Sequence, residues 1–276
     1  MPAASGALGI VAGGGPLPGL IAAACRAQGR PVHVVALDGH ADLQALAGSP
    51  YTRVRLGAPG RALAALRAAG CTAVVLAGPV RRPGLWSLRP DWRAARVLAR
   101  AGREGWGDDA LLRAILTELE AEGFTVLGVQ DLLGELRAPA GTWGRYTPDS
   151  AAEADIARGL AVADALGAAD VGQAVVVQQG LVLGVEAAEG TDALLQRCGP
   201  LRRPGPGGVL VKRAKPGQDR RADLPTIGPE TVAAAAAAGL RGLVVGAGDT
   251  LVLDLAETVA RADRGGLFLA GRPPAP

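Results

Sequence analysis

Short apolar runs alternate with helical patterns over the first 130 residues of the chain. The runs LGIVAG, VHVVAL and TAVVLAG are apolar at nearly every position, and amphipathic segments such as RALAALRAAG separate them. Strands that are apolar on both faces are typical of a parallel sheet covered by helices. The pattern predicts an α/β domain over residues 1–135 with a doubly wound, Rossmann-like arrangement.

A second α/β domain is predicted over residues 151–276. Residues 136–150 before it contain prolines and glycines without periodicity, which is typical of a linker. A capping residue, Asp149 or Ser150, precedes an alanine-rich helix, and the dipeptide Gln179-Gly180 separates two strand-like runs. Further apolar runs alternate with helices as far as GLFLAG, so we expect a mixed sheet in this domain.

Composition narrows the class of protein. The 276 residues are 49% hydrophobic and 20% charged, which describes a globular chain with one large or two medium domains. The net charge is only +3, the basic residues are dispersed, and 3% of residues are aromatic. These values disfavour a nucleic-acid partner, because surfaces that bind nucleic acids carry clustered basic side chains together with aromatic ones.

The apolar stretch at residues 9–25 is not a secretion signal, because it lacks a basic opening segment and is broken by glycines and prolines. The three cysteines form no CxxC pair, and the chain has only two histidines, which argues against a structural zinc. Unpaired thiols and no signal together indicate a reducing cytoplasm.

A triple glycine, Gly13, Gly14 and Gly15, follows the first predicted strand and precedes the first predicted helix. Backbone amides at such a point can bind a phosphate. The sequence GGGPLP does not match GxGxxG, so a ligand-facing loop and a tight turn both stay open.

Two lysines stand out among 29 basic residues, because all the others are arginines. Lys212 and Lys215 both lie in the segment VKRAKPGQDRRADLPTIG. A compact ammonium group retained in an arginine-rich chain is suited to phosphate oxygens, although coincidence is the alternative.

Carboxylates gather beside the predicted strand ends of the second domain. They include Glu186, Glu189 and Asp192 in one segment and Asp219 and Asp223 in another. Such oxygen ligands suit Mg²⁺. Helix capping, turn formation or pairing with arginine could explain most of them singly. Asp223 is the exception, because it precedes the proline-shaped loop LPTIG just before a helix.

Four motifs occur together in one order: GIVAGGGPLP, GDDALL with Arg113 after it, GLVLGVEAAEGTDALLQR and KRAKPGQDRRADLPTIG. On these motifs the chain resembles the LpxI-type UDP-2,3-diacylglucosamine diphosphatases of bacterial lipid A biosynthesis, over essentially its whole length. One departure is Pro79, where relatives more often carry a polar residue.

The resemblance implies a Mg²⁺-dependent hydrolase that converts UDP-2,3-diacylglucosamine to UMP and 2,3-diacylglucosamine 1-phosphate (lipid X). It also implies a cytoplasmic homodimer that associates peripherally with the inner membrane. The expected catalytic residues are Asp223, Lys212 and Lys215, and the expected metal ligands are Asp223 and Asp192. The expected substrate-binding residues are Gly13, Gly14, Gly15, Glu189, Gly190, Thr191, Asp192, Gln218 and Thr226.

Two alternatives remain. A non-catalytic nucleotide-sugar or lipid-binding module of related fold would bind the substrate without turnover. A dehydrogenase would bind a nicotinamide cofactor, but its glycine pattern is incomplete and the second domain has no convincing proton-transfer group.

Overall fold

The computed structural model describes residues 6–80, 90–104 and 108–273. The chain forms two compact units, each with its own sheet and hydrophobic core. The first unit comprises Met1–Gly134 and Asp219–Asp223, and the second comprises Glu135–Gln218 and Leu224–Pro276. The chain therefore leaves the second unit for five residues and then returns to it.

The first unit is built on a five-stranded sheet in which every pairing is parallel. Its strand order, β3-β2-β1-β4-β5, is the order of a doubly wound fold. The strands are β1 (Ala7–Ala12), β2 (Val32–Leu37), β3 (Tyr51–Val54), β4 (Cys71–Ala77) and β5 (Thr125–Leu127). The apolar runs thus form a parallel sheet, which confirms the prediction for this region.

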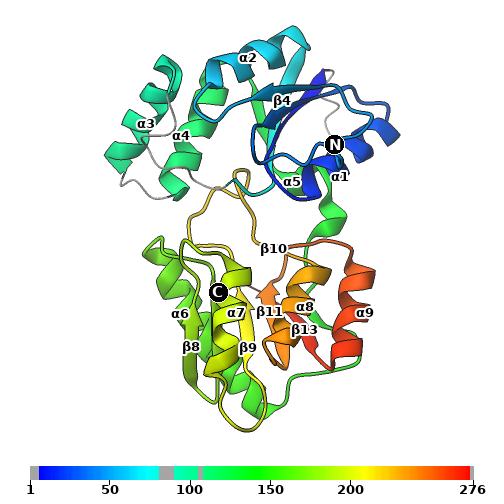
Figure 1. The fold of residues 1–276 in the computed structure, drawn as a ribbon, viewed down its shortest axis with the longest axis vertical. Coiled ribbons are helices and arrows are strands. Elements are labelled where there is room, and N and C mark those ends of the chain that lie inside the picture. Colours follow the sequence, from blue (N-terminus) through cyan, green and yellow to red (C-terminus); the bar gives the residue numbers. More distant parts are fainter. Residues whose placement is uncertain (1–5, 81–89, 105–107, 274–276) are drawn as a thin grey trace. The chain divides into compact units, whose positions relative to one another are not determined.

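Helices cover the sheet of the first unit on both sides. They are α1 (Leu17–Ala27), α2 (Pro59–Ala68), α3 (Trp92–Glu104), α4 (Asp108–Ala121) and the short α5 (Val129–Leu132). Leu66 of α2 and Leu116 of α4 pack against the strands in one cluster, and Figure 1 shows α1 and α5 on the opposite side of the sheet from α2. Val97 of α3 packs on α4.

The second unit has a six-stranded mixed sheet with the order β6-β13-β11-β9-β7-β8. Its strands are β6 (Gly141–Trp143), β7 (Ala174–Gln178), β8 (Leu181–Val185), β9 (Val209–Lys212), β11 (Gly242–Gly246) and β13 (Phe268–Arg272). The central strands β9, β11 and β13 are parallel, and the outer pairings are antiparallel. A separate pair, β10 (Thr226–Ile227) and β12 (Leu251–Val252), is parallel. The mixed sheet confirms the prediction.

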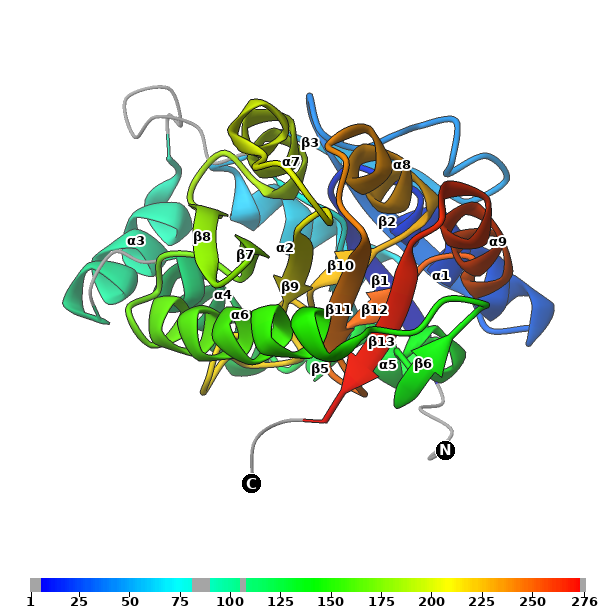
Figure 2. The same cartoon turned by 90° about the horizontal axis from the view of Figure 1, so that it is seen from below.

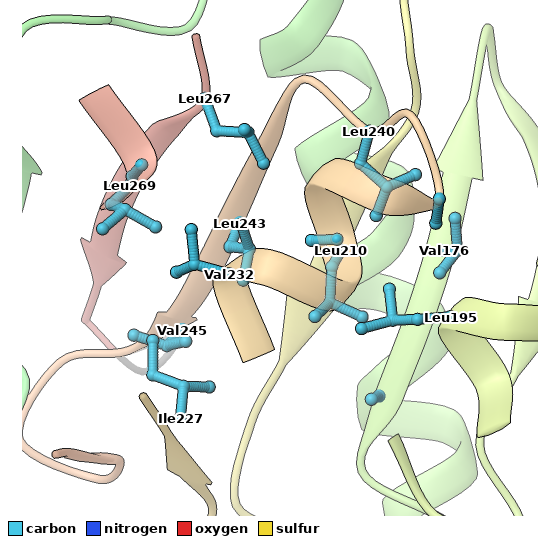
Figure 3. Close-up of a cluster of buried hydrophobic side chains, with 14 of the residues drawn as sticks. Val176, Leu195, Leu210, Ile227, Val232, Leu240, Leu243, Val245, Leu267 and Leu269 are labelled. Atoms are coloured by element: carbon cyan, nitrogen blue, oxygen red, sulfur yellow. The ribbon is translucent and has the colours of Figure 1, made fainter. Parts of the chain in front are cut away.

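Four helices enclose this second sheet. They are α6 (Ser150–Ala168), α7 (Thr191–Cys198), α8 (Pro229–Ala237) and α9 (Leu255–Gly265), with a 3-10 turn at Gly199–Leu201. Figure 2 shows α6 along one face and α7, α8 and α9 along the other. The core on the three-helix face includes Leu195, Leu210 and Val232 (Figure 3). None of the helices in the described part of the chain is long and apolar enough to cross a bilayer.

The stretch 136–150, predicted to be a linker, contributes to the second sheet. It contains β6, which pairs with β13, and the amide of Ala138 donates to Thr250 O at 2.8 Å. Trp143 is buried there. Asp149 is the helix-capping residue of the two candidates, since its Oδ1 accepts from Ala152 N at 2.7 Å. These contacts make the stretch part of the second unit.

The β7–β8 hairpin forms where the sequence predicts it. Gln179 and Gly180 have φ values of 52° and 76°, and such positive values at both central residues match the twist of a two-residue hairpin. The carboxylate of Asp155 on α6 accepts both of their amides, at 3.1 and 2.7 Å. The turn is therefore fixed from the helix beneath it.

The three cysteines, Cys25, Cys71 and Cys198, are free and buried. Burial raises the pKa of each thiol. The protonated thiols therefore act as small apolar side chains of the cores rather than as nucleophiles.

Candidate functional site

A buried lysine forms the centre of a polar cluster in the second unit. Lys212, the last residue of β9, is only 7% exposed. Its Nζ donates to Thr191 Oγ1 at 2.9 Å and to the backbone oxygen of Thr226 at 3.2 Å. Burying an ammonium group is costly unless hydrogen bonds compensate it. The structure thus brings together three residues that the sequence predicts for the site, from β9, α7 and β10.

Glu186 extends this cluster. It directly follows β8, is 6% exposed, and accepts the hydroxyl proton of Thr191 at Oε1 over 2.8 Å. Its Oε2 is buried without a hydrogen-bond partner in the described part of the chain. Glu186 is one of the carboxylates beside the predicted strand ends, but it is not among the predicted site residues. A glycine turn between Glu186 and Thr191, five residues apart, would bring the two side chains together. This spacing is the sequence feature that could have indicated Glu186.

That turn depends on Gly190, whose φ of +82° favours glycine, and it is held by Glu189. The Glu189 Oε1 accepts from Arg197 Nε at 3.1 Å and from Nη2 at 2.8 Å, and Oε2 accepts from the amide of Ala187 at 3.2 Å. The Arg197 guanidinium lowers the pKa of the Glu189 carboxyl. In this structure Glu189 and Gly190 serve the turn that presents Thr191.

Asp192, the second residue of α7, is exposed and lines a groove of about 420 Å³. The groove is also lined by Gln196, Arg202 and alanines of α8. Within the described residues, no three His, Cys, Asp or Glu side chains are grouped so that they could hold a metal ion.

Lys215 pairs with a residue that the sequence did not single out. Its Nζ lies 2.6 Å from Asp170 Oδ1. Its backbone amide donates to Gln218 Oε1 at 3.2 Å, and Gln218 N donates back to Lys215 O at 3.2 Å. Lys215 and Gln218 together close the turn at Gly217. Nothing in the sequence around Asp170 signals this ion pair.

Asp223 is exposed and belongs to the segment Asp219–Asp223 of the first unit. The residue before it, Ala222, is buried in the core of that unit. Thr226, three residues later, already belongs to the second unit. Its Oγ1 donates to Leu224 O at 3.2 Å, which shapes the loop between the two residues.

The triple glycine forms a tight turn. The amide of Gly13 donates to Ala77 O at 2.8 Å, and that of Gly14 donates to Pro79 O at 2.9 Å. A Cβ atom on Gly13 would lie 2.5 Å from Gly78 O. The amides of Gly13 and Gly14 thus donate within the turn, and both residues stay predicted substrate contacts. Gly15, with φ of +72°, stays a predicted substrate contact.

Known proteins resemble the whole chain. Residues 7–136 match the family model of the LpxI N-terminal domain, and residues 139–270 match that of the LpxI C-terminal domain. UDP-2,3-diacylglucosamine pyrophosphatase LpxI of Caulobacter vibrioides is 45% identical over 276 residues, which cover 97% of this chain and 98% of the relative. The chain therefore belongs to the LpxI family.

Proposed function

We propose that this protein hydrolyses the diphosphate bond of UDP-2,3-diacylglucosamine in lipid A biosynthesis. The observation that carries the proposal is the 45% identity to a relative named for that activity, over nearly the full length of both chains. The buried cluster of Lys212, Thr191 and Thr226 supports it from the structure. A fixed ammonium group is suited to an anionic diphosphate.

The reaction we propose yields UMP and 2,3-diacylglucosamine 1-phosphate. Water attacks one phosphorus, a new P–O bond forms, and the bond from that phosphorus to the bridging oxygen breaks. The bridging oxygen leaves with the other phosphate, and the water gives up a proton. Attack at either phosphorus gives the same two products.

Lys212 would stabilise the negative charge that develops on the diphosphate. Thr191 and the Thr226 carbonyl already orient its Nζ, so little reorganisation is needed when charge develops. Lys215 would contribute a second positive charge if its ion pair with Asp170 opened to substrate. Asp223 is exposed and is our proposed catalytic carboxylate.

We propose Mg²⁺ as the cofactor. Mg²⁺ prefers one or two carboxylates together with waters and substrate phosphates, and Asp223 and Asp192 are exposed acids of the kind that it binds. Asp223 and Asp192 would hold the ion. When bound, Mg²⁺ neutralises phosphoryl charge and makes a coordinated water more acidic.

The proposed substrate carries two acyl chains, so we propose that the protein works in the cytoplasm at the surface of the inner membrane. We also propose that it is a homodimer. Sedimentation with vesicles and light scattering after size-exclusion chromatography test these two points separately.

The decisive experiment measures UMP release from UDP-2,3-diacylglucosamine by the purified protein with Mg²⁺ or with EDTA. We expect Mg²⁺-dependent turnover, and a loss of about a hundredfold or more in kcat for Asp223→Asn. Asp254→Asn, at the start of α9, is the matched control and should retain activity. Substrate binding without turnover by the wild-type protein would show a binding module and overturn the proposal.

A further inference from the structure

The position of Asp223 is set by contacts that the preceding four residues make within the first unit. We propose that Glu120 and Gln130 are positioning residues for Asp223, because they hold the backbone that ends at this carboxylate. The inference rests on the proposed function, since it takes Asp223 as the catalytic carboxylate. It adds to that function two residues of the N-terminal half, about a hundred positions away in the sequence.

The segment is first shaped by its own side chains. Asp219 Oδ1 accepts from the backbone amide and from Nε of Arg221, both at 3.0 Å, while Oδ2 accepts from Nη2 at 2.7 Å. The amide of Ala222 donates to Asp219 O at 2.9 Å. Arg221 thereby lowers the pKa of the Asp219 carboxyl. A two-pronged contact with a guanidinium fixes orientation as well as distance, so the turn has one geometry.

The first unit then holds this turn through successive residues. Gln130 Nε2, in α5, donates to Arg220 O at 3.2 Å. Arg221 Nη1 donates to Glu120 Oε1, in α4, at 2.7 Å. Ala222 is 8% exposed and packs in the hydrophobic cluster that contains Leu116 and Leu119 of α4.

Asp223 follows these anchored residues directly. Consecutive Cα atoms are about 3.8 Å apart, so fixing the backbone of residues 220 to 222 leaves the next Cα little freedom. Asp223 itself is an exposed residue. The backbone that leads to this exposed residue is thus held within the first unit.

A merely structural role makes a different prediction. If the contacts only stabilise the fold, breaking them lowers the melting temperature and affects kcat through loss of folded protein. If they position Asp223, kcat falls while folded protein and KM are kept. The exposed Arg221–Glu120 pair suits this comparison, because side chains that are 40% and 44% exposed contribute little to stability.

The experiment compares Glu120→Ala and Glu120→Gln with Glu230→Ala, which removes the ion pair between Arg261 of α9 and Glu230 of α8. For Glu120→Ala we expect kcat to fall on the order of tenfold, with KM within about twofold of wild type. Glu120→Gln keeps an acceptor oxygen and should recover most of the activity. Glu230→Ala should match wild type. Hydrogen exchange of the Arg221 and Ala222 amides should accelerate in Glu120→Ala alone.

A double mutant separates the two roles further. In an Asp223→Asn background, Glu120→Ala should cause no additional loss of kcat, because its effect acts through the missing carboxylate. Wild-type kcat in Glu120→Ala, or a full additional loss in the double mutant, would overturn the inference. If the wild-type protein does not turn over, the proposed function fails. If Asp223→Asn is fully active, hydrolysis stands, but Asp223 has no catalytic role and the inference is overturned.

Discussion

The Oγ1 of Thr191 lies 2.9 Å from the Nζ of Lys212. Thr191 is the first residue of α7 and Lys212 is the last residue of β9. The same hydroxyl donates to Glu186 Oε1 at 2.8 Å. Thr191 therefore links a buried ammonium to a buried carboxylate. A hydroxyl can do this because it is both a donor and an acceptor.

Replacing this hydroxyl should weaken catalysis more than binding. In Thr191→Val the branched shape is kept, but Lys212 loses one acceptor and Glu186 loses its donor. We expect kcat to fall by about tenfold to a hundredfold, because the ammonium is no longer held in one orientation. Thr191→Ser, which keeps the hydroxyl, should stay within about threefold of wild type. Steady-state UMP release measures both, and equal kcat values for Val and Ser variants would show that the link has no catalytic role.

Metal removal should stop the reaction without weakening the fold. The two carboxylates that we propose as ligands leave most of the coordination sphere to water and substrate phosphates, so Mg²⁺ alone should bind too weakly to stabilise the free protein. We expect the melting temperature to change by less than about 1 °C between Mg²⁺ and EDTA, while UMP release is lost in EDTA. Adding UMP and lipid X should make the melting temperature depend on Mg²⁺. A rise of several degrees with Mg²⁺ alone would instead indicate a preformed site.

The sheets could be predicted because their strands are buried on both faces. Val34, Val35, Val74 and Val75 are fully buried, and this burial appears in the sequence as uninterrupted apolar runs. Residues 136–150 gave no such signal, since β6 has only three residues and depends on pairing with β13 at the far end of the chain. Local periodicity cannot report a pairing of that kind.

In the candidate site, too, some residues could be predicted from the sequence and others could not. Lys212, Thr191 and Thr226 lie in two recognisable motifs, and the structure brings them together. The partners of Lys215 and Arg221 could not be predicted, because Asp170 and Glu120 are charged residues in helix-rich sequence with no local feature that marks them. Only the tertiary structure shows that these two acids are the ion-pair partners of Lys215 and Arg221.

The close approach between Gly78 and the turn at Gly13 and Gly14 predicts how glycine substitutions affect stability. Gly78 has φ of +85°, and a Cβ atom there would lie 2.1 Å from the backbone oxygen of Gly14. Gly29 has a similar φ of +68° but open space around it. Gly29→Ala should cost about 1–2 kcal/mol of unfolding free energy from backbone strain alone. Gly78→Ala should cost at least about 2 kcal/mol more, because backbone must move. Urea unfolding compares the two variants, and equal losses would mean that the close approach is not maintained in solution.

The Asp219–Arg221 contact should make stability depend on pH. The Arg221 guanidinium holds the pKa of Asp219 below its ordinary value of 3.8, so the folded state favours the ionised carboxyl. A carboxyl with a depressed folded pKa stabilises the protein above its unfolded pKa and loses that effect as the pH falls through the folded pKa. Asp219→Asn should therefore lower the free energy of unfolding at pH 7, by about 1–2 kcal/mol for hydrogen bonds to a charged partner. Below pH 3.8 the difference from wild type should shrink, because protonation weakens the same contact in the wild type. Urea unfolding midpoints of both proteins at pH 7, 5 and 3 measure this difference in stability. A difference that stays constant over this range would show that the carboxylate charge does not stabilise the segment before Asp223.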